Sequence, residues 1–299
     1  MTAASGILVI DKPEGLSSAA VVARVKRLSR AAKVGHAGTL DPFASGVLVC
    51  CLNRATKLAR FLLQGAKHYQ ALLQLGVETD TQDATGREIA RRPLPPLSKS
   101  RIDQACDPFR GDFLQRPPVY SALKHQGRPL YDWARKGQPV EKPPRPVTIN
   151  KLAVVAAALP LVRIEVQCSA GTYIRTLAAD IGHALGCGAH LKALRRTRSA
   201  GFGIDQSVTL AQMEAMADER SLNAAMVRPA DALKKMPERV ANRALATQIA
   251  HGRPLPPSDT LDWPDGFVKI VDRRRGLLAV IEVDRPRSRY QYCCVLNGC

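Results

Sequence analysis

The sequence has no cysteine pattern of a metal centre or a disulfide framework. Its eight cysteines include no Cys-x-x-Cys pair, and no cluster of cysteine and histidine has the spacing of a zinc site. Cys50, Cys51 and Cys168 stand in apolar stretches typical of strands, where a thiol packs as a small hydrophobic group. This usage is typical of a reducing compartment, so we expect a cytoplasmic protein that binds no metal.

Segments that would lead to a membrane are also lacking. The N-terminal residues show no basic stretch followed by an apolar one, so no signal peptide is expected. The longest apolar stretch, residues 152–162, contains Pro160 and is too short to span a bilayer. We therefore expect no membrane association.

Acidic residues are scarce relative to basic ones: 26 Asp and Glu stand against 44 Lys and Arg, a formal charge of +18 over 299 residues. The excess favours a polyanionic partner, and nucleic acid before a membrane because no basic amphipathic anchor is present. An aid to solubility is the alternative. Residues 238–299 carry ten basic and seven acidic side chains, a net of +3, which leaves +15 in the first 237 residues.

The stretch from Gly35 to Gly46, GHAGTLDPFASG, holds three glycines, one proline, one histidine and one aspartate. Glycine permits unusual backbone angles, and Pro42 pushes Asp41 toward an extended conformation. We expect a tightly shaped loop with the Asp41 carboxylate at its apex. Such a group can be a nucleophile, an acid or base, or a ligand. An Asx turn that only satisfies the loop is the alternative.

Hydrophobic periodicity predicts an alternation of strands and helices in the first two thirds of the chain. Strands are expected at 6–10, 47–52, 67–77 and 162–168, and helices at 18–28 (capped by Ser17 or Ser18), 56–63, 130–135 and 174–185. Proline-rich residues 91–97 and 137–146 predict loops. Residues 113–140 hold five basic side chains and one acidic one, which indicates a mobile basic flap in an insertion at about 113–146.

Two residues beside these elements allow more than one interpretation. Tyr69, on the apolar face at the start of strand 67–77, is either a core tyrosine or a platform for a base. Arg175 flanks an apolar stripe just inside a helix N-terminus, where the helix dipole disfavours a cation. It indicates either a specific anionic partner or a surface arginine whose stem covers apolar groups.

Residues 181–204 contain no carboxylate but include Lys192, Arg195, Arg196 and Arg198. Basic and apolar side chains alternate through residues 190–196. This is the best candidate surface for nucleic acid in the chain, and a solvated helix end is the alternative.

The last part of the chain has the composition of a separate small domain. Residues 208–235 are expected to be helical with a turn at Pro229, and Pro237 marks a boundary. After it we expect a helix at 241–250 and paired strands at 267–271 and 277–283. We therefore predict two domains, 1–237 and 238–299, of which the second is small and β-rich.

The segment at 35–46 resembles the signature of the TruB family of pseudouridine synthases. Five further stretches match that family in its order: residues 67–69, 79–83, 117–124, 171–175 and 190–196. Together they are highly specific and cover residues 6–233. The tail from about residue 238 is similar to the PUA module, an RNA-binding domain often appended to these enzymes.

The resemblance implies an α+β fold, in which a mixed, largely antiparallel sheet is flanked by helices and followed by a β-rich PUA-like domain. It implies isomerisation of the uridine at tRNA position 55, in the T-loop, to pseudouridine, with no metal and no cofactor. The partner would be the T-loop and stem of tRNA. We expect no obligatory protein partner and a monomer.

The resemblance also assigns roles to individual residues. Asp41 matches the catalytic aspartate, Tyr69 the tyrosine that stacks on the target base, and Arg175 the arginine that pairs with the aspartate. Leu194 matches a residue that closes the pocket, and His36 one that helps to hold the flipped-out nucleotides. The further RNA-binding residues are expected to be Tyr173, Lys12, Lys57, Lys124, Arg195 and Arg196.

The chain departs from the family pattern at Ala37, Phe43 and Ser45, none of which is the nucleophile, and its cysteine-rich end at 292–299 has no counterpart there. Two other functions stay open: an RNA-binding helper of tRNA folding in which catalysis is secondary, and a pseudouridine synthase that acts on another RNA. A metal-dependent hydrolase is disfavoured because no carboxylate or histidine pair stands at ligand spacing near Asp41.

Overall fold

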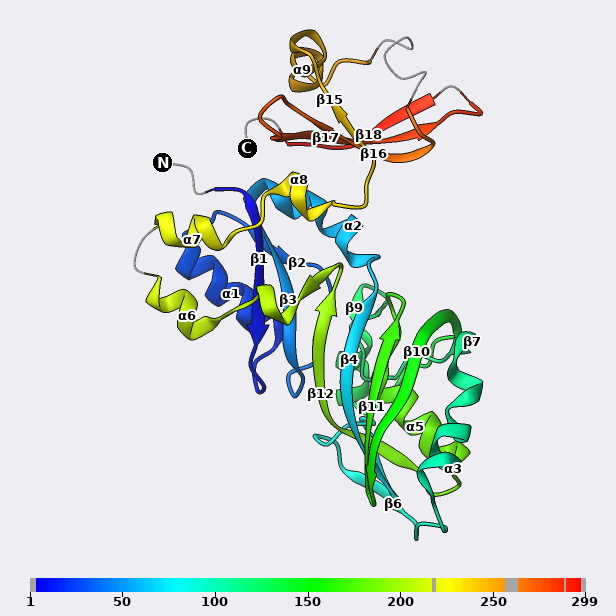
Figure 1. The fold of residues 1–299 in the computed structure, drawn as a ribbon. Helices are drawn as coiled ribbons and strands as arrows, with labels where there is room; N and C mark the ends of the chain where they lie inside the picture. Colours follow the sequence, from blue (N-terminus) through cyan, green and yellow to red (C-terminus); the bar gives the residue numbers. More distant parts are fainter. Residues whose placement is uncertain (1–3, 217–218, 256–262, 288, 297–299) are drawn as a thin grey trace.

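The computed structural model describes residues 4–216, 219–255, 263–287 and 289–296. Its main body contains a ten-stranded sheet in the order β14-β1-β3-β12-β4-β11-β10-β7, with β2 also paired to β3 and β13 to β12 (Figure 1). These strands are β1 (Gly6–Lys12), β2 (Val34–His36), β3 (Ser45–Leu52), β4 (Lys67–Leu75), β7 (Gly111–Gln115), β10 (Arg145–Ala158), β11 (Leu161–Cys168), β12 (Ala189–Ser199), β13 (Phe202–Gly203) and β14 (Val208–Thr209). β1 runs parallel to β14 and β3 parallel to β12, while the other pairings described for this sheet are antiparallel. The predicted fold class is confirmed.

Alternation along the strands separates two faces of this sheet. In β4, Tyr69, Ala71 and Leu73 are buried, because they pack with the apolar stripe of α5 (Ile174–Ala184) in one cluster. The same cluster includes Ile102 of α3 (Lys99–Ala105). One face of β4 and its neighbours is therefore covered by α5 and α3.

Helix α1 (Ser18–Ser29) covers β1 and β3 at the other end of the sheet, with Val21 and Val25 buried. The Ser17 Oγ accepts a 3.1 Å hydrogen bond from the Ala20 backbone N–H, which confirms the predicted cap. Two short helices complete this side, α6 (Leu210–Ala215) and α7 (Glu219–Ala225), whereas α8 (Pro229–Ala232) packs in the cluster with Ile7 and Val9 on the other face of β1. They follow β14, so residues 208–235 are not one helical stretch.

A second sheet forms the C-terminal part, in the order β15-β16-β17-β18. Its strands are β15 (Glu238–Val240), β16 (Gly266–Val271), β17 (Leu277–Asp284) and β18 (Arg289–Val295), and α9 (Arg243–Ala250) accompanies them. β16 and β17 are the antiparallel pair that the sequence predicts. An apolar cluster that includes Val271 and Leu277 together with Ile7 and Leu62 joins the two parts.

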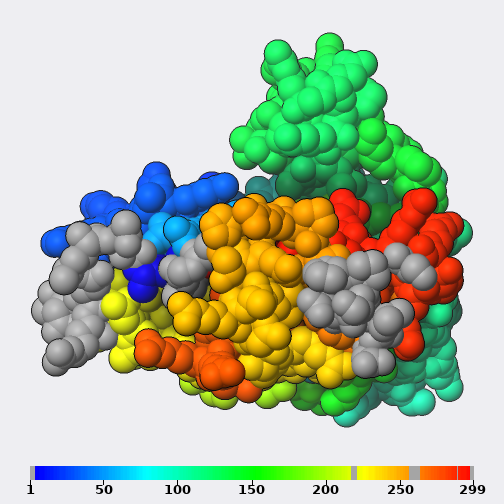
Figure 2. All heavy atoms as spheres, turned by 90° about the horizontal axis from the view of Figure 1, so that it is seen from above, coloured from blue at the N-terminus to red at the C-terminus, as the bar shows by residue number. Residues whose placement is uncertain are grey.

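The insertion stands apart from the body. β8 (Lys124–His125), β9 (Arg128–Pro129) and α4 (Leu130–Arg135) follow one another there, and the predicted helix has the expected bounds. Figure 2 shows this segment as a bright green lobe that projects from the rest of the molecule. The Trp133 and His125 rings meet edge to face, 5.6 Å between centroids, so the lobe has its own small packing. Its mobility stays a prediction.

Three expectations about elements need correction. The helix predicted at 56–63 is a 3₁₀ helix (Asn53–Leu58) followed by α2 (Ala59–Leu63). The strand predicted at 67–77 ends at Leu75, because Gly76 takes a positive φ of 82° before β5 (Val77–Thr79), which pairs with β6 (Glu88–Arg91). Residues 190–196 belong to strand β12, so the alternative of a helix end is wrong. The cysteine-rich end contributes residues 292–295 to β18, and Cys299 lies outside the described residues.

Candidate active site

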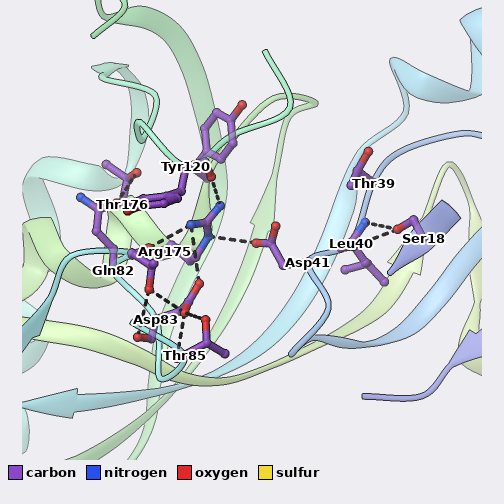
Figure 3. A network of polar contacts seen from close by, with 12 residues as sticks. Ser18, Thr39, Leu40, Asp41, Gln82, Asp83, Thr85, Tyr120, Arg175 and Thr176 are labelled. Atoms are coloured by element: carbon purple, nitrogen blue, oxygen red, sulfur yellow. Dashed lines mark hydrogen bonds and ion pairs between the residues drawn. The ribbon is translucent and has the colours of Figure 1, made fainter. Parts of the chain in front are cut away.

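Asp41 lies in the loop between β2 and β3, which contacts from other elements hold in place. The Ser18 Oγ donates to the Leu40 carbonyl (2.9 Å) and accepts from the Leu40 N–H (2.8 Å). The Pro42 carbonyl accepts from the Gly15 N–H (2.8 Å) and from the Lys12 ammonium (3.2 Å). The residues on both sides of Asp41 are therefore anchored to β1 and to the start of α1, and Figure 3 shows the Ser18–Leu40 contact.

Arg196 anchors the same loop from the other side. Its guanidinium, 1% exposed, donates to the carbonyls of Gly38 (2.9 Å), Thr39 (3.2 Å) and, in β3, Val47 (2.8 Å). β12 approaches so closely here that a Cβ on Gly46 would lie 2.2 Å from the Arg196 carbonyl oxygen. Gly46 also has a φ of 106°, so a glycine is required at the end of the loop.

Arg175, in the first turn of α5, points at Asp41. Its Nε lies 2.9 Å from Asp41 Oδ2, and the two side chains are 5% and 36% exposed. Its Nη1 donates to the Thr81 carbonyl (2.9 Å) and its Nη2 to the Tyr120 carbonyl (2.7 Å). A buried guanidinium aimed by these carbonyls can orient a carboxylate that solvent still reaches, and the alternative of a surface arginine is wrong.

A second carboxylate, Asp83, completes this network and was not among the predicted site residues. Its Oδ2 lies 3.6 Å from Arg175 Nη1, and its Oδ1 accepts from the Thr81 hydroxyl (2.8 Å) and from Thr85 N–H (2.9 Å) and hydroxyl (2.6 Å). The polar stretch 79–86 thus combines turn hydrogen bonds with an ion pair to Arg175. Figure 3 shows Arg175 between the two carboxylates.

Two hollows meet at Asp41 and Arg175, which line both. The first, of about 420 Å³, is also lined by Tyr69 from β4, Leu194 from the neighbouring strand β12, and Tyr173. In the register of these strands Leu194 pairs with Ala71, two residues beyond Tyr69, so the two side chains are diagonal neighbours on one face. Burial raises the pKa of the Tyr69 phenol, against the opposing effect of Arg196, so the ring stays uncharged. This hollow brings together the residues predicted to surround the target base.

The second hollow, of about 520 Å³, holds His36 and is bordered by the insertion through Tyr120, Tyr131 and Arg135. Burial, and to a smaller extent Arg196, lowers the pKa of His36, so its imidazole is neutral at pH 7. A neutral imidazole between the Asp41 loop and the projecting lobe can both donate and accept hydrogen bonds, as the expected role in holding nucleotides requires.

The structure separates the cations predicted to contact RNA. Lys12 and Arg196 are buried and donate to loop carbonyls. Their burial disfavours a direct contact with RNA. Lys57 donates to the Val295 carbonyl (2.8 Å) and so links the two sheets. Arg195 is 40% exposed and pairs with Asp11 (2.7 Å), and Lys124 is exposed in the projecting lobe.

Lys67 lines the first hollow and was not predicted as a site residue. Its ammonium donates to the carbonyls of Leu63 (2.8 Å) and Gly65 (2.6 Å). Burial, aided by the nearby Arg196 charge, lowers the pKa of Lys67 to about 8. At the same hollow, the Gln115 side-chain amide donates to the Tyr173 carbonyl and accepts from the Tyr173 N–H. The Arg145 guanidinium lies 5.0 Å from the Tyr173 ring centroid.

Within the described residues, no group of three or more His, Cys, Asp and Glu side chains is arranged to hold a metal ion. None of the helices in the same described residues is long and apolar enough to span a membrane.

Two family models match the chain without a gap between them. The TruB family pseudouridylate synthase N-terminal domain matches residues 26–174, and the tRNA pseudouridylate synthase B C-terminal domain matches residues 175–234. The chain belongs to the TruB family of pseudouridine synthases. The family expected from the motifs is thus confirmed, and with it the assignment as an isomerase.

Curated relatives and solved structures resemble this TruB-family chain over most of its length. The tRNA pseudouridine synthase B of Burkholderia mallei is 46% identical over 93% of this chain and 93% of the relative, and that of Bordetella parapertussis is 49% identical over 75% and 93%. A structure titled as a Cbf5-Nop10-Gar1 complex matches with a TM-score of 0.73 and 28% identity, over 93% of this chain and 78% of that chain. An H/ACA RNP bound to a substrate RNA containing 2'-deoxyuridine matches with a TM-score of 0.71 and 26% identity over the same shares.

Proposed function

We propose that this protein converts the uridine at position 55 of the tRNA T-loop to pseudouridine, with Asp41 as nucleophile. The curated relatives at 46–49% identity are named tRNA pseudouridine synthase B, which supports tRNA as the substrate. The observation that carries the proposal is the 2.9 Å ion pair between Arg175 and Asp41 beside Tyr69 and Leu194. It orients a carboxylate next to a slot formed by Tyr69 and Leu194, whose apolar surfaces can hold a base.

The reaction needs no atom beyond those of the nucleotide and the carboxylate. Asp41 attacks either the ribose C1' or the uracil ring, the N1–C1' bond breaks, and the detached base turns so that its C5 faces C1'. The new C5–C1' bond then forms as the aspartate is released, C5 loses its proton to solvent and N1 gains one, so the product is an isomer of the substrate. The first route parallels the nucleophile of retaining glycosidases.

The target uridine must leave its stack before a carboxylate reaches it. Tyr69 then stacks on the flipped base, and Leu194 closes the slot. His36, in the adjoining hollow, holds neighbouring unstacked nucleotides against the projecting lobe. Arg195, Lys124 and Tyr173 contribute contacts to the RNA around the two hollows.

We further propose that residues 1–237 form the catalytic domain and that residues 238–299 form a PUA-like RNA-binding domain. The protein acts as a monomer in the cytoplasm without an obligatory protein partner. It would differ in this from the structural neighbours, whose titles name Nop10 and Gar1 beside Cbf5.

Release of tritium from C5-tritiated uridine in an unmodified tRNA transcript tests this proposal. Wild-type protein should release tritium, and Asp41→Asn should not, while both bind the transcript with similar affinity. A transcript that lacks the T-loop uridine is the control for position. Tight binding without release by the wild type would refute the proposal and favour an RNA-folding helper or a different RNA substrate.

A further inference from the structure

A third hollow, of about 510 Å³, lies on the opposite face of the sheet from Asp41. Along β4, His68 alternates with Tyr69, so the two side chains point to opposite faces. His68 lies beside Gln167 of β11 and Arg198 of β12 in register, and all three line this hollow. Residues 231–236, which lead to the second sheet, form its outer wall, and we call it the reverse-face hollow.

The floor of the reverse-face hollow is apolar. Phe61 and Leu62 of α2 form one side, and Phe202 and Leu233 form the other. The Phe61 ring is half-buried and meets Phe267 of β16 edge to face, 5.3 Å between centroids, so it is held in place. A hollow of several hundred Å³ that combines apolar side chains with polar groups able to fix a ligand's orientation has the usual character of a ligand site.

The rim of the hollow is basic. Arg198, Lys234 and Lys235 are exposed, and none of them makes a hydrogen bond or ion pair with another described residue. The single carboxylate at the rim, Asp231, is already paired with Arg228 (2.8 Å). Burial and the charges of Arg198 and Lys151 lower the pKa of His68, which favours its neutral form, so the net charge of the rim comes from the three exposed cations.

Three uncompensated cations above an apolar, partly aromatic floor match a phosphate joined to a flat base. We propose that the reverse-face hollow binds an unpaired nucleotide of single-stranded RNA, with the base on the floor near Phe61 and the phosphate among Arg198, Lys234 and Lys235. The chain's net charge of +18 favours RNA as the source of this nucleotide over a free nucleoside monophosphate. Asp41 lies on the other face, so the site is independent of the proposed reaction.

Binding of a labelled six-adenosine RNA to the full chain, followed by fluorescence anisotropy over a range of salt concentrations, tests this site. An RNA without uridine offers no target to Asp41. The variant Arg198→Ala/Lys234→Ala/Lys235→Ala should bind it about tenfold or more weakly. The magnitude of the slope of log K against log salt should fall by about 0.7, because the contact with one single-stranded phosphate is lost.

The variant Lys99→Ala/Arg101→Ala/Arg163→Ala is the matched control, since it removes the same charge from exposed residues outside the hollow. It should bind the RNA like the wild type. Both variants should turn over a T-arm stem-loop at the wild-type rate, and this assay reports the proposed function separately. The proposal would be overturned if the two variants bound the hexamer with equal affinity. It would also be overturned if the Arg198→Ala/Lys234→Ala/Lys235→Ala variant lost as much T-arm turnover as hexamer affinity.

Adenosine monophosphate as a competitor identifies the source of the nucleotide. Weak competition at millimolar concentration supports RNA. Competition at micromolar concentration that the rim variant abolishes would overturn RNA as the occupant and assign the hollow to a free nucleotide.

Discussion

Substitution of Arg196 by lysine tests whether this cation shapes the active site or binds RNA. Three carbonyls, of Gly38, Thr39 and Val47, accept from the Arg196 guanidinium. A lysine keeps the positive charge but ends in one compact ammonium, which cannot reach three carbonyls spread along a planar fork. The substitution therefore removes hydrogen bonds while it preserves charge.

The expected loss follows from those bonds. Hydrogen bonds to a charged group contribute about 1.5–3 kcal/mol each, so two lost bonds should lower the free energy of unfolding by about 3–6 kcal/mol. Without these bonds the Asp41 loop is free to shift, and a misplacement of about 1 Å reduces turnover by about 100-fold. RNA affinity should change by less than about threefold, and its salt slope should stay the same, because no phosphate contact is lost.

Urea unfolding followed by circular dichroism, tritium release and anisotropy over a range of salt concentrations measure the three quantities. Arg195→Lys is the matched control: this neighbour is 40% exposed and pairs with Asp11, so its unfolding free energy should change by less than about 1 kcal/mol. If Arg196→Lys proved as stable as the wild type but bound RNA weakly, the structural role assigned to Arg196 would be wrong.

Three further outcomes follow from the same geometry. Gly46→Ala should cost about 3 kcal/mol or more in urea unfolding, because its Cβ would meet the Arg196 carbonyl, whereas Gly186→Ala, also at positive φ but in open space, should cost about 1 kcal/mol. Asp83→Asn should reduce tritium release about tenfold or more with RNA affinity retained, since Arg175 loses a charged partner; unchanged release would show that Arg175 is aimed without Asp83. Folded Lys67 releases its proton near pH 8 and unfolded lysine near 10.5, so the unfolded chain binds more protons between these values and the Lys67 contribution to stability rises with pH. The difference in unfolding free energy between wild type and Lys67→Met should therefore move in favour of the wild type from about pH 7.5 to 9.5, and a constant difference would contradict the lowered pKa.

Local patterns predicted the elements whose determinants are local. The glycines and proline of residues 35–46 indicated a shaped loop, and alternation in 162–168 indicated a half-buried strand, which is β11. The Ser17 cap and the helix at 130–135 also follow from a few neighbouring residues. The helix predicted at 56–63 differs because residues 53–58 make tighter 3₁₀ turns before α2.

The inward cations escaped prediction because their partners come from distant segments. Lys12 reaches Pro42, and Arg196 reaches Gly38, only because β1, β3 and β12 lie side by side. A strand assignment for residues 190–196 would have helped, since alternation sends Arg195 and Arg196 to opposite faces. Asp83 depends on a contact with α5, about ninety residues away, which no local pattern encodes.

The same contacts that fix the loop also set the electrostatics around Asp41. The cationic groups of Lys12 and Arg196 donate to the loop carbonyls, and the Arg175 guanidinium forms an ion pair with the Asp41 carboxylate itself. None of the three has to move when RNA arrives, because the carbonyl partners of each are already in place, so the charge that stabilises Asp41 is present before the substrate. What remains to be supplied by the RNA is the exclusion of water from a carboxylate that is 36% exposed. The projecting lobe borders the His36 hollow through Tyr120, Tyr131 and Arg135, so RNA that fills this hollow would lie between the lobe and the Asp41 loop.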